Sequence, residues 1–405
     1  MYDVYKVRQN FPIFSVTING KENVFLDSAA SAQKPLSVIE KMHHVYSQEY
    51  ANVHRGSYHL SEQITTAYED ARSIIHEFLN SKSDKEIVFV RNATEGINLV
   101  ASTWAKKYLK AGDEVLISEA EHHANLVPWQ MLRDELGIHL KIFKVSDKGE
   151  YLEDEYLKLL SEKTKLVAVS GMSNVLGTVF PIKKIISQAH KYGAKVLVDA
   201  CQYAVHRKID VQDLDCDFLV FSGHKTYGPS GIGVLYGKYE ILDSMPPYQY
   251  GGDMVDTVSY EKTTFNEPPF RFEAGTPAII PAIGLGEALS FMMNLGMDNI
   301  NNHEQDLTKY MTSSLSEIKG LNVIGQAENK GGVFSFSIDG IHPQDIAFIL
   351  DKEGISIRTG HHCAQPIVNR MGYESLSRAS IGLYNTREDI DTFIQSLYKV
   401  KKFFI

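Results

Sequence analysis

The feature that most constrains the fold is a repeated alternation between short apolar runs and longer amphipathic stretches. Apolar runs occupy residues 86–90, 114–118, 165–169, 195–199 and 218–221, and a further run at 234–236 follows a glycine turn and is expected to run back along the sheet. Apolar strands separated by amphipathic helical segments are typical of a mostly parallel sheet covered by helices. The sequence therefore predicts an α/β protein.

The pattern changes after about residue 281. A helix is expected from residue 282, and the runs at 332–338, 355–358 and 379–383 have the composition of half-buried strands. Thr386 is expected to be the N-cap of the last helix. We therefore expect a large α/β domain over residues 20–290 and a smaller α+β domain formed by residues 1–19 and 291–405.

Charge and cysteine content argue against several classes of protein. The 41 lysines and arginines are outnumbered by 50 aspartates and glutamates, and the net charge of −9 does not suit a nucleic-acid partner. No apolar run approaches the roughly 18 residues that cross a bilayer, so no membrane partner is expected. The first residues also lack the pattern of a secretion signal. Three cysteines without a CxxC pair favour a reducing, cytoplasmic location, and Cys216 is expected in the core.

Lys225 and Asp199 each follow or end a predicted strand, at the sheet edge where α/β proteins bind ligands. His224 separates Gly223 from the lysine, so this is no Walker phosphate loop, and Lys225 is either a Schiff-base lysine or a solvated one. Asp199 is either a helix N-cap or a buried acid that needs a partner. Pyridoxal phosphate needs a lysine, an acid for its ring nitrogen and a phosphate site, and Gln202 could reach its ring oxygen.

Several short segments could complete such a site. A phosphate group is attracted to a strand–turn–helix junction because backbone N–H groups are free there. The candidates for the phosphate are Thr94, Glu95, Ser222, His224 and Thr276, and His122 could lie flat over the cofactor ring. Each of these residues also has an ordinary alternative role in a turn, in a helix cap or at the surface.

Cys363 lies in a loop of glycine, histidine and proline over residues 358–366. A nearby imidazolium lowers the pKa of a thiol, and an exposed loop lets it attack a substrate. Adjacent ligands without a second cluster form a poor zinc pattern, so no metal is expected. An inert exposed cysteine is the alternative.

Two arginines beside predicted strands, Arg358 and Arg378, could bind a substrate carboxylate through their planar guanidinium groups. Ordinary surface ion pairs are the alternative for both. His54 and Arg55 lie in a glycine-punctuated segment that carries no decisive signal by itself.

Taken together, these segments resemble pyridoxal-phosphate enzymes of fold type I in the class-V aminotransferase family, and most closely the SUF-system (group II, SufS-type) cysteine desulfurases. The resemblance runs essentially end to end, and the cysteine loop is its most specific part. The matching segments are 26–30, 52–56, 92–95, 121–125, 198–202, 222–225, 273–277 and 358–363. The resemblance implies a large domain with a mostly parallel seven-stranded sheet, a smaller α+β domain, and a homodimer.

The resemblance also implies a role for each residue. Lys225 would hold the cofactor and remove the α-proton, Asp199 would pair with the ring nitrogen, and Gln202 with the ring hydroxyl. His122 would stack on the ring. The phosphate would be bound by Thr94, Glu95, Ser222 and His224, with Thr276 from a second subunit. The substrate L-cysteine would be bound by Asn174, Arg358, Arg378, His54 and Arg55.

Cys363 would then take the sulfur as a persulfide, leaving L-alanine, and pass it to a SufU-type or SufE-type acceptor for iron–sulfur cluster assembly. His342 resembles the histidine that exchanges with a zinc ligand of SufU-type acceptors, although an ordinary loop histidine is the alternative. A selenocysteine lyase is the runner-up. An aminotransferase or a kynureninase-like enzyme would not need Cys363. A non-catalytic scaffold would not need Lys225 and Asp199, and both are present.

Overall fold

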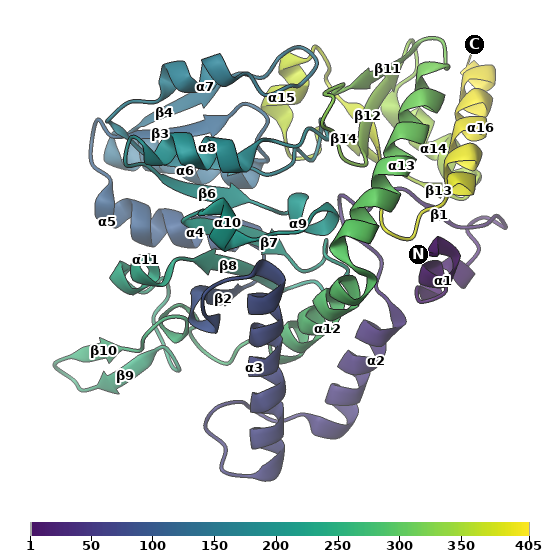
Figure 1. Cartoon of the computed structure of the whole chain (residues 1–405). Helices are drawn as coiled ribbons and strands as arrows, with labels where there is room; N and C mark the ends of the chain where they lie inside the picture. Colours follow the sequence, from purple (N-terminus) through teal and green to yellow (C-terminus); the bar gives the residue numbers. More distant parts are fainter. Residues whose placement is uncertain (1, 405) are drawn as a thin grey trace.

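The computed structural model describes residues 2–404, and its central feature is a seven-stranded sheet in the order β2-β8-β7-β6-β5-β3-β4 (Figure 1). Only β8 runs against its neighbours, so the sheet is mostly parallel, as predicted. The strands are β2 (Ile87–Val90), β3 (Glu114–Ser118), β4 (His139–Phe143), β5 (Thr164–Ser170), β6 (Lys195–Asp199), β7 (Phe218–Ser222) and β8 (Gly233–Gly237).

The six predicted strands of this sheet are confirmed to within one residue at either end. The seventh, β4, was not predicted, because it is an edge strand in which only Phe143 is buried. An edge strand exposes one side to solvent and therefore carries polar residues that hide its apolar pattern.

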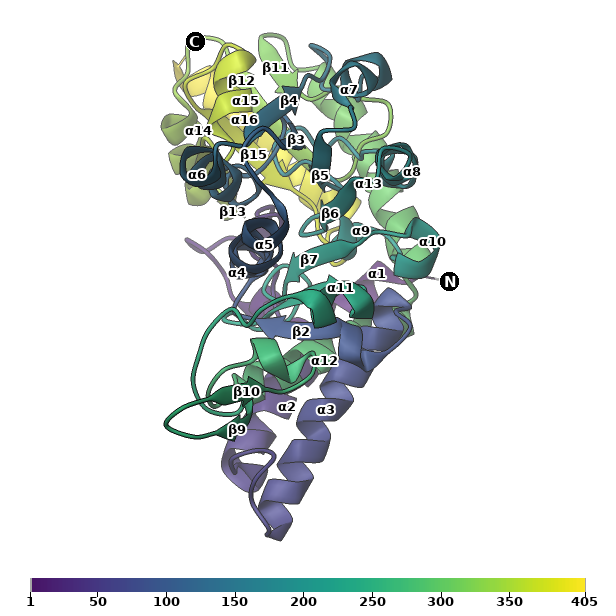
Figure 2. The ribbon, with the colours of Figure 1, turned by 90° about the vertical axis from the view of Figure 1, so that its left-hand side faces the viewer.

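Alternate side chains of the strands enter two separate cores, one on each face of the sheet. Leu116, Val167 and Val196 belong to one core, whereas their chain neighbours Val115, Leu166 and Leu197 belong to the other. Figure 2 shows helices on both sides of the strands. The helices of this part are α2 (Leu36–His44), α3 (His59–Leu79), α4 (Ala93–Val100), α5 (Lys106–Tyr108), α6 (Val127–Leu136), α7 (Glu153–Leu159), α8 (Ile182–His190), α9 (Tyr203–His206), α10 (Val211–Leu214), α11 (Tyr239–Ser244) and α12 (Ile279–Leu295).

A second, antiparallel sheet lies near the C-terminus in the order β11-β12-β15-β14. Its strands are β11 (Leu321–Ile324), β12 (Val333–Ile338), β14 (Arg358–Gly360) and β15 (Leu376–Ser380). The helices packed around it are α13 (Met297–Ser316), α14 (Pro343–Lys352), α15 (Gln365–Arg370) and α16 (Arg387–Phe404). Thr386 caps α16, because its hydroxyl accepts a hydrogen bond from Asp389 N–H at 3.2 Å.

Two strand predictions in this region need correction. The predicted strand at 355–358 is split between β13 (Ile355–Ser356), which pairs with β1 (Val24–Phe25), and β14 in the second sheet. The predicted strand at 379–383 lies earlier, as β15, because the chain turns at Gly382, whose N–H donates to the side chain of Asn385 instead of to a strand. Apolar composition located both segments but could not fix which partner strand takes each residue.

A hairpin of β9 (Val255–Val258) and β10 (Thr263–Phe265) projects from the molecule, apart from the two larger sheets (Figures 1 and 2).

Within residues 2–404, no single helix is long and apolar enough to cross a membrane, and α12 and α13 pass that test only as a pair bent by 75°.

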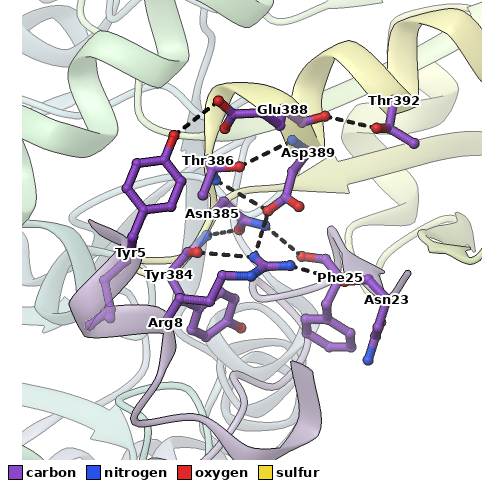
Figure 3. A network of polar contacts seen from close by, with 12 residues as sticks. Tyr5, Arg8, Asn23, Phe25, Tyr384, Asn385, Thr386, Glu388, Asp389 and Thr392 are labelled. Atoms are coloured by element: carbon purple, nitrogen blue, oxygen red, sulfur yellow. Dashed lines mark hydrogen bonds and ion pairs between the residues drawn. The ribbon is translucent and has the colours of Figure 1, made fainter. Parts of the chain in front are cut away.

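The N-terminal helix α1 (Val4–Arg8) is tied to the start of α16 by a polar network (Figure 3). The Arg8 guanidinium donates to Asp389 Oδ2 at 2.8 Å, to the Tyr384 carbonyl at 3.1 Å and to the Asn23 carbonyl at 3.2 Å. Tyr5 donates to the carboxylate of Glu388 at 2.9 Å. Residues 1–19 were predicted to belong to the smaller domain; the boundaries as such stay a prediction.

We expect the Arg8→Ala variant to lose about 2–3 kcal/mol of unfolding free energy, because it leaves the buried Asp389 carboxylate without its cation. Burial already raises the pKa of Asp389 in spite of Arg8. Urea unfolding monitored by circular dichroism measures the loss. Lys6→Ala on the same helix is the matched control and should change stability by less than about 0.5 kcal/mol, because Lys6 is exposed. Equal losses in both variants would contradict the assignment.

Candidate active site

A cavity of about 210 Å³ lies at the carboxyl ends of the parallel strands. Ser170, Asp199 and Ser222 end β5, β6 and β7, and all three line it. The carboxyl ends of parallel strands meet at one edge of a sheet, so residues far apart in the sequence come together there. The loop between β14 and α15 closes the cavity from the side of the second sheet.

The cavity brings together most of the predicted site residues. Those that line it are Thr94, His122, Asn174, Asp199, Gln202, Ser222, His224, Lys225, Arg358, Cys363 and Arg378. Five others lie elsewhere in this chain. Glu95 and Thr276 line a neighbouring cavity of about 440 Å³, His54 and Arg55 line one of about 280 Å³, and His342 is the N-cap of α14.

Three of these outlying side chains are held by acidic or basic partners elsewhere in the chain. Glu95 accepts a hydrogen bond from Arg91 Nε at 2.9 Å. His54 Nε2 lies 3.0 Å from a Glu69 oxygen, and Arg55 Nε lies 3.3 Å from Asp253 Oδ1. These contacts hold Glu95, His54 and Arg55 away from the cavity formed by their own chain.

Asp199 is a buried acid at the end of β6. Its carboxylate accepts one hydrogen bond, from Cys201 N–H at 2.9 Å, and it forms no ion pair with any residue between 2 and 404. A buried carboxylate is costly unless it is paired, and a protonated pyridine nitrogen is a suitable partner. With Lys225 lining the same cavity, the donor set fits the ring of pyridoxal phosphate.

The phosphate end of such a cofactor would face the start of α4. Asn92 caps this helix by accepting from Glu95 N–H at 3.0 Å, and Ser222 Oγ accepts from Ala93 N–H at 2.9 Å. Burial lowers the pKa of His224 to about 4, and the nearby positive charges of Lys225 and Lys34 lower it further. Hydroxyl groups, a helix start and positive charge suit an anion.

His122 is fixed in a neutral form beside Lys225. Its Nδ1 accepts a hydrogen bond from Ala124 N–H at 3.0 Å. Burial and the charge of Lys225 lower the pKa of His122 to about 4, so the imidazole is uncharged near neutral pH. A neutral aromatic ring can lie against a cofactor ring without introducing a second positive charge.

A pair of arginines is held by Asp27, to which sequence reasoning had assigned no role. Arg378 is buried, and it donates to the Asn174 carbonyl at 3.0 Å and to Asp27 Oδ1 at 3.3 Å, while Arg358 Nη1 lies 3.9 Å from Asp27 Oδ2. Burial lowers the pKa of Arg378 to about 10, which still leaves it cationic near neutral pH. The available signal was the motif at 26–30 that contains Asp27.

The cysteines differ sharply in accessibility. Cys363 is exposed at the mouth of the cavity, whereas Cys201 and Cys216 are buried. Burial raises the pKa of Cys201 to about 12 and raises that of Cys216 as well, so neither forms a thiolate readily. The prediction that Cys216 lies in the core is confirmed.

We expect His362 to make the stability of the protein depend on pH. Burial and the neighbouring charges of Arg378 and Arg358 lower its pKa to about 3, against about 6.5 in an unfolded chain. Below pH 6.5 the unfolded chain therefore binds a proton that the folded chain refuses, so stability falls as pH falls. When the pH is lowered from 7.5 to 5, the unfolding free energy of the unmodified protein should fall by about 2 kcal/mol more than that of the His362→Gln variant.

Urea unfolding at both pH values measures this difference. The matched control is His139→Gln on the exposed edge of β4, which should keep the pH dependence of the unmodified protein. An identical loss in His362→Gln and the unmodified protein would contradict the effect.

Comparison with known proteins agrees with this geometry. The family described as aminotransferase class V matches residues 24–393, and the chain therefore belongs to the class-V aminotransferase family, whose cofactor is pyridoxal phosphate. It is a homologue of cysteine desulfurases. A probable cysteine desulfurase of Synechocystis sp. is 49% identical over 401 residues, covering 98% of this chain and 96% of that protein.

Two further relatives extend the comparison. A cysteine desulfurase of Synechococcus elongatus is 48% identical over 400 residues and 99% of this chain, but this chain spans only 64% of the length of that relative. The apo structure of a cysteine desulfurase from Thermococcus onnurineus NA1 has a TM-score of 0.94 to this structure, with 37% identity and 98% of both chains covered. The fold is that of the fold-type-I pyridoxal-phosphate enzymes, as the sequence predicted.

Proposed function

We propose that this chain converts L-cysteine to L-alanine and carries the released sulfur as a persulfide on Cys363. The observation that carries the proposal is the exposed Cys363 thiol on the same cavity as Lys225 and Asp199. An aminotransferase would have no use for that thiol, whereas a desulfurase requires it. The 48–49% identity to proteins named as cysteine desulfurases supports the same conclusion.

The residues of the cavity divide the work. Pyridoxal phosphate, when bound, supplies an electron sink that acidifies the α-hydrogen of an amino acid. Lys225 takes that proton on Nζ and returns it within the site. Asp199 supplies the negative charge that would stabilise the protonated ring nitrogen of the cofactor. Asn174 and Arg378 orient the substrate carboxylate.

Cys363 performs the sulfur transfer. Its thiolate attacks the sulfur of the substrate, so an S–S bond forms and the bond between sulfur and the substrate β-carbon breaks. The electron pair of that bond stays with the carbon skeleton, which takes up a proton and leaves as alanine. Exposure of Cys363 leaves the outer sulfur open to the thiol of an acceptor.

We propose that the acceptor is a SufU-type protein, with a SufE-type protein as the alternative, and that the sulfur serves iron–sulfur cluster assembly in a SUF system. Support comes from His342, which caps α14 with Nδ1 accepting from Gln344 N–H at 3.2 Å. Its Nε2 is therefore free to replace a zinc ligand of a partner. A cytoplasmic location is proposed as well, because none of the three cysteines is in a disulfide.

We propose a homodimer in which Thr276, His54 and Arg55 serve the site of the other subunit. Their positions around two cavities next to, but outside, the Lys225 cavity support this. Tyr50 and Tyr58, which flank His54 and Arg55 in the sequence, are exposed, and such aromatic side chains are typical of interface cores. Light scattering of the purified protein tests the dimer.

The deciding experiment incubates the cofactor-loaded protein with L-cysteine and a thiol reductant, and measures alanine and sulfide. Equal amounts of both products are expected. If the protein instead forms alanine from L-selenocysteine but not from L-cysteine, the result would support the alternative, a selenocysteine lyase. Absence of both activities in a protein that binds the cofactor would refute the proposal.

A further inference from the structure

His123 makes two hydrogen bonds to the backbone of the Cys363 loop, one at Cys363 itself and one two residues later. Its backbone N–H donates to the carbonyl of Cys363 at 2.7 Å, and its ring Nε2 accepts a hydrogen bond from the N–H of Gln365 at 3.0 Å. The residue just before it, His122, lines the cavity. Adjacent residues of one segment therefore reach the cofactor cavity and the reactive loop.

The loop needs such contacts because its backbone is strained. His362 and Cys363 have φ angles of 54° and 55°, a left-handed conformation that residues other than glycine rarely adopt. Two such residues in succession persist only where the surroundings hold them in place. Asn174 Nδ2 donates to the His362 carbonyl at 2.7 Å and holds the preceding peptide. His123 holds Cys363 itself and the start of α15.

His123 is in turn anchored to the sheet through Glu121. The buried Glu121 carboxylate accepts from Asn125 Nδ2 at 2.7 Å, from the Ser170 hydroxyl at 2.5 Å and from Ser170 N–H at 3.0 Å. Ser170 ends β5 and lines the cavity, so the segment 121–125 has a fixed place beside it. His123 therefore fixes the position of the Cys363 loop relative to the carboxyl end of β5.

The hydrogen bond from Gln365 also fixes the chemical form of His123. A ring nitrogen that accepts a hydrogen bond carries no proton, so the imidazole is neutral with its hydrogen on Nδ1. Burial and the neighbouring His361 lower the pKa of His123, which favours this form. Any side chain with an acceptor at the same reach could make the contact.

We propose that His123 is a positioning residue that holds Cys363 in reach of the substrate sulfur, through the acceptor on its ring; this rests on the proposed desulfurase function. Misplacing a reacting group by about 1 Å can cost about 10²-fold in rate. Loss of the acceptor should therefore slow sulfur transfer, while the proton chemistry of Lys225 continues.

The test compares His123→Leu with His123→Gln in the cofactor-loaded protein. The two side chains have similar size, but only glutamine has an oxygen that can accept from Gln365 N–H. Persulfide formation on Cys363 is followed by mass spectrometry after mixing with L-cysteine. Exchange of the α-hydrogen of L-alanine in D₂O, followed by NMR, reports Lys225 without using Cys363.

His123→Leu should form the persulfide about 10²-fold more slowly, with alanine exchange within about twofold of the unmodified protein. His123→Gln should recover most of the persulfide rate, and the control His139→Leu should leave both rates unchanged. Equal persulfide rates in the leucine and glutamine variants, or a parallel loss of alanine exchange, would overturn the proposal. Absence of persulfide in the unmodified protein would refute the proposed desulfurase function itself. A failure of the His123 proposal alone would leave persulfide formation in the unmodified protein intact.

Discussion

Lys225→Ala is expected to lower alanine formation from L-cysteine by about 10⁴-fold or more, equivalent to about 5 kcal/mol of activation free energy. Lys225 is a side-chain amine on the cavity that also holds Asp199 and His122. The substitution removes both the amine proposed to bind the cofactor covalently and the group proposed to take the α-proton. The yellow colour of lysine-bound cofactor should disappear at the same time.

Three measurements make this prediction specific. Alanine is quantified after incubation with L-cysteine, α-hydrogen exchange of L-alanine is followed by NMR, and unfolding in urea confirms that the variant is folded. The control is Lys163→Ala, which should retain full activity. Lys163 is an exposed lysine just before β5, at the end of that strand away from the cavity. Addition of a small primary amine should restore part of the exchange rate, because it supplies the missing base. A Lys225→Ala variant with the activity of the unmodified protein would refute the assigned role.

The sheet could be predicted from the sequence because its strands are buried on both faces. A strand such as β7 is apolar at four of its five positions and buried at all of them, and this signal does not depend on its neighbours. The strands β13 and β14 are short and their partners are distant in the sequence, so composition alone could not divide residues 355–360 between two sheets. The half-exposed edge strand β4 was missed for a related reason.

The same distinction applies to the site. Asp199, Ser222 and Lys225 could be predicted because each ends or follows a strong apolar strand, which places it at the ligand edge of the sheet. Asp27 and His123 were not singled out, because their partners, Arg378 and the Cys363 loop, lie more than 200 residues away in the sequence. A local pattern carries no record of such contacts.

The second large effect is expected at Cys363. In Cys363→Ser, alanine and sulfide formation from L-cysteine should fall by about 10²–10⁴-fold, because an alcohol cannot take up the sulfur as a persulfide. The α-hydrogen exchange of L-alanine should stay within about twofold of the unmodified protein, since Lys225 and Asp199 are untouched. This separation of two measured rates distinguishes a lost nucleophile from a damaged fold.

Accessibility provides the control for Cys363, because it is the exposed cysteine while Cys201 and Cys216 are buried. Iodoacetamide should label the folded protein at one site per chain and inactivate it, and should leave folded Cys363→Ser unlabelled. With L-selenocysteine, the Cys363→Ala variant should still release selenium, since selenium release does not require a thiolate acceptor. Full activity of that variant toward L-cysteine would refute the persulfide route, and would leave the cavity of Lys225 and Asp199 as the site of a reaction in which the thiol has no part.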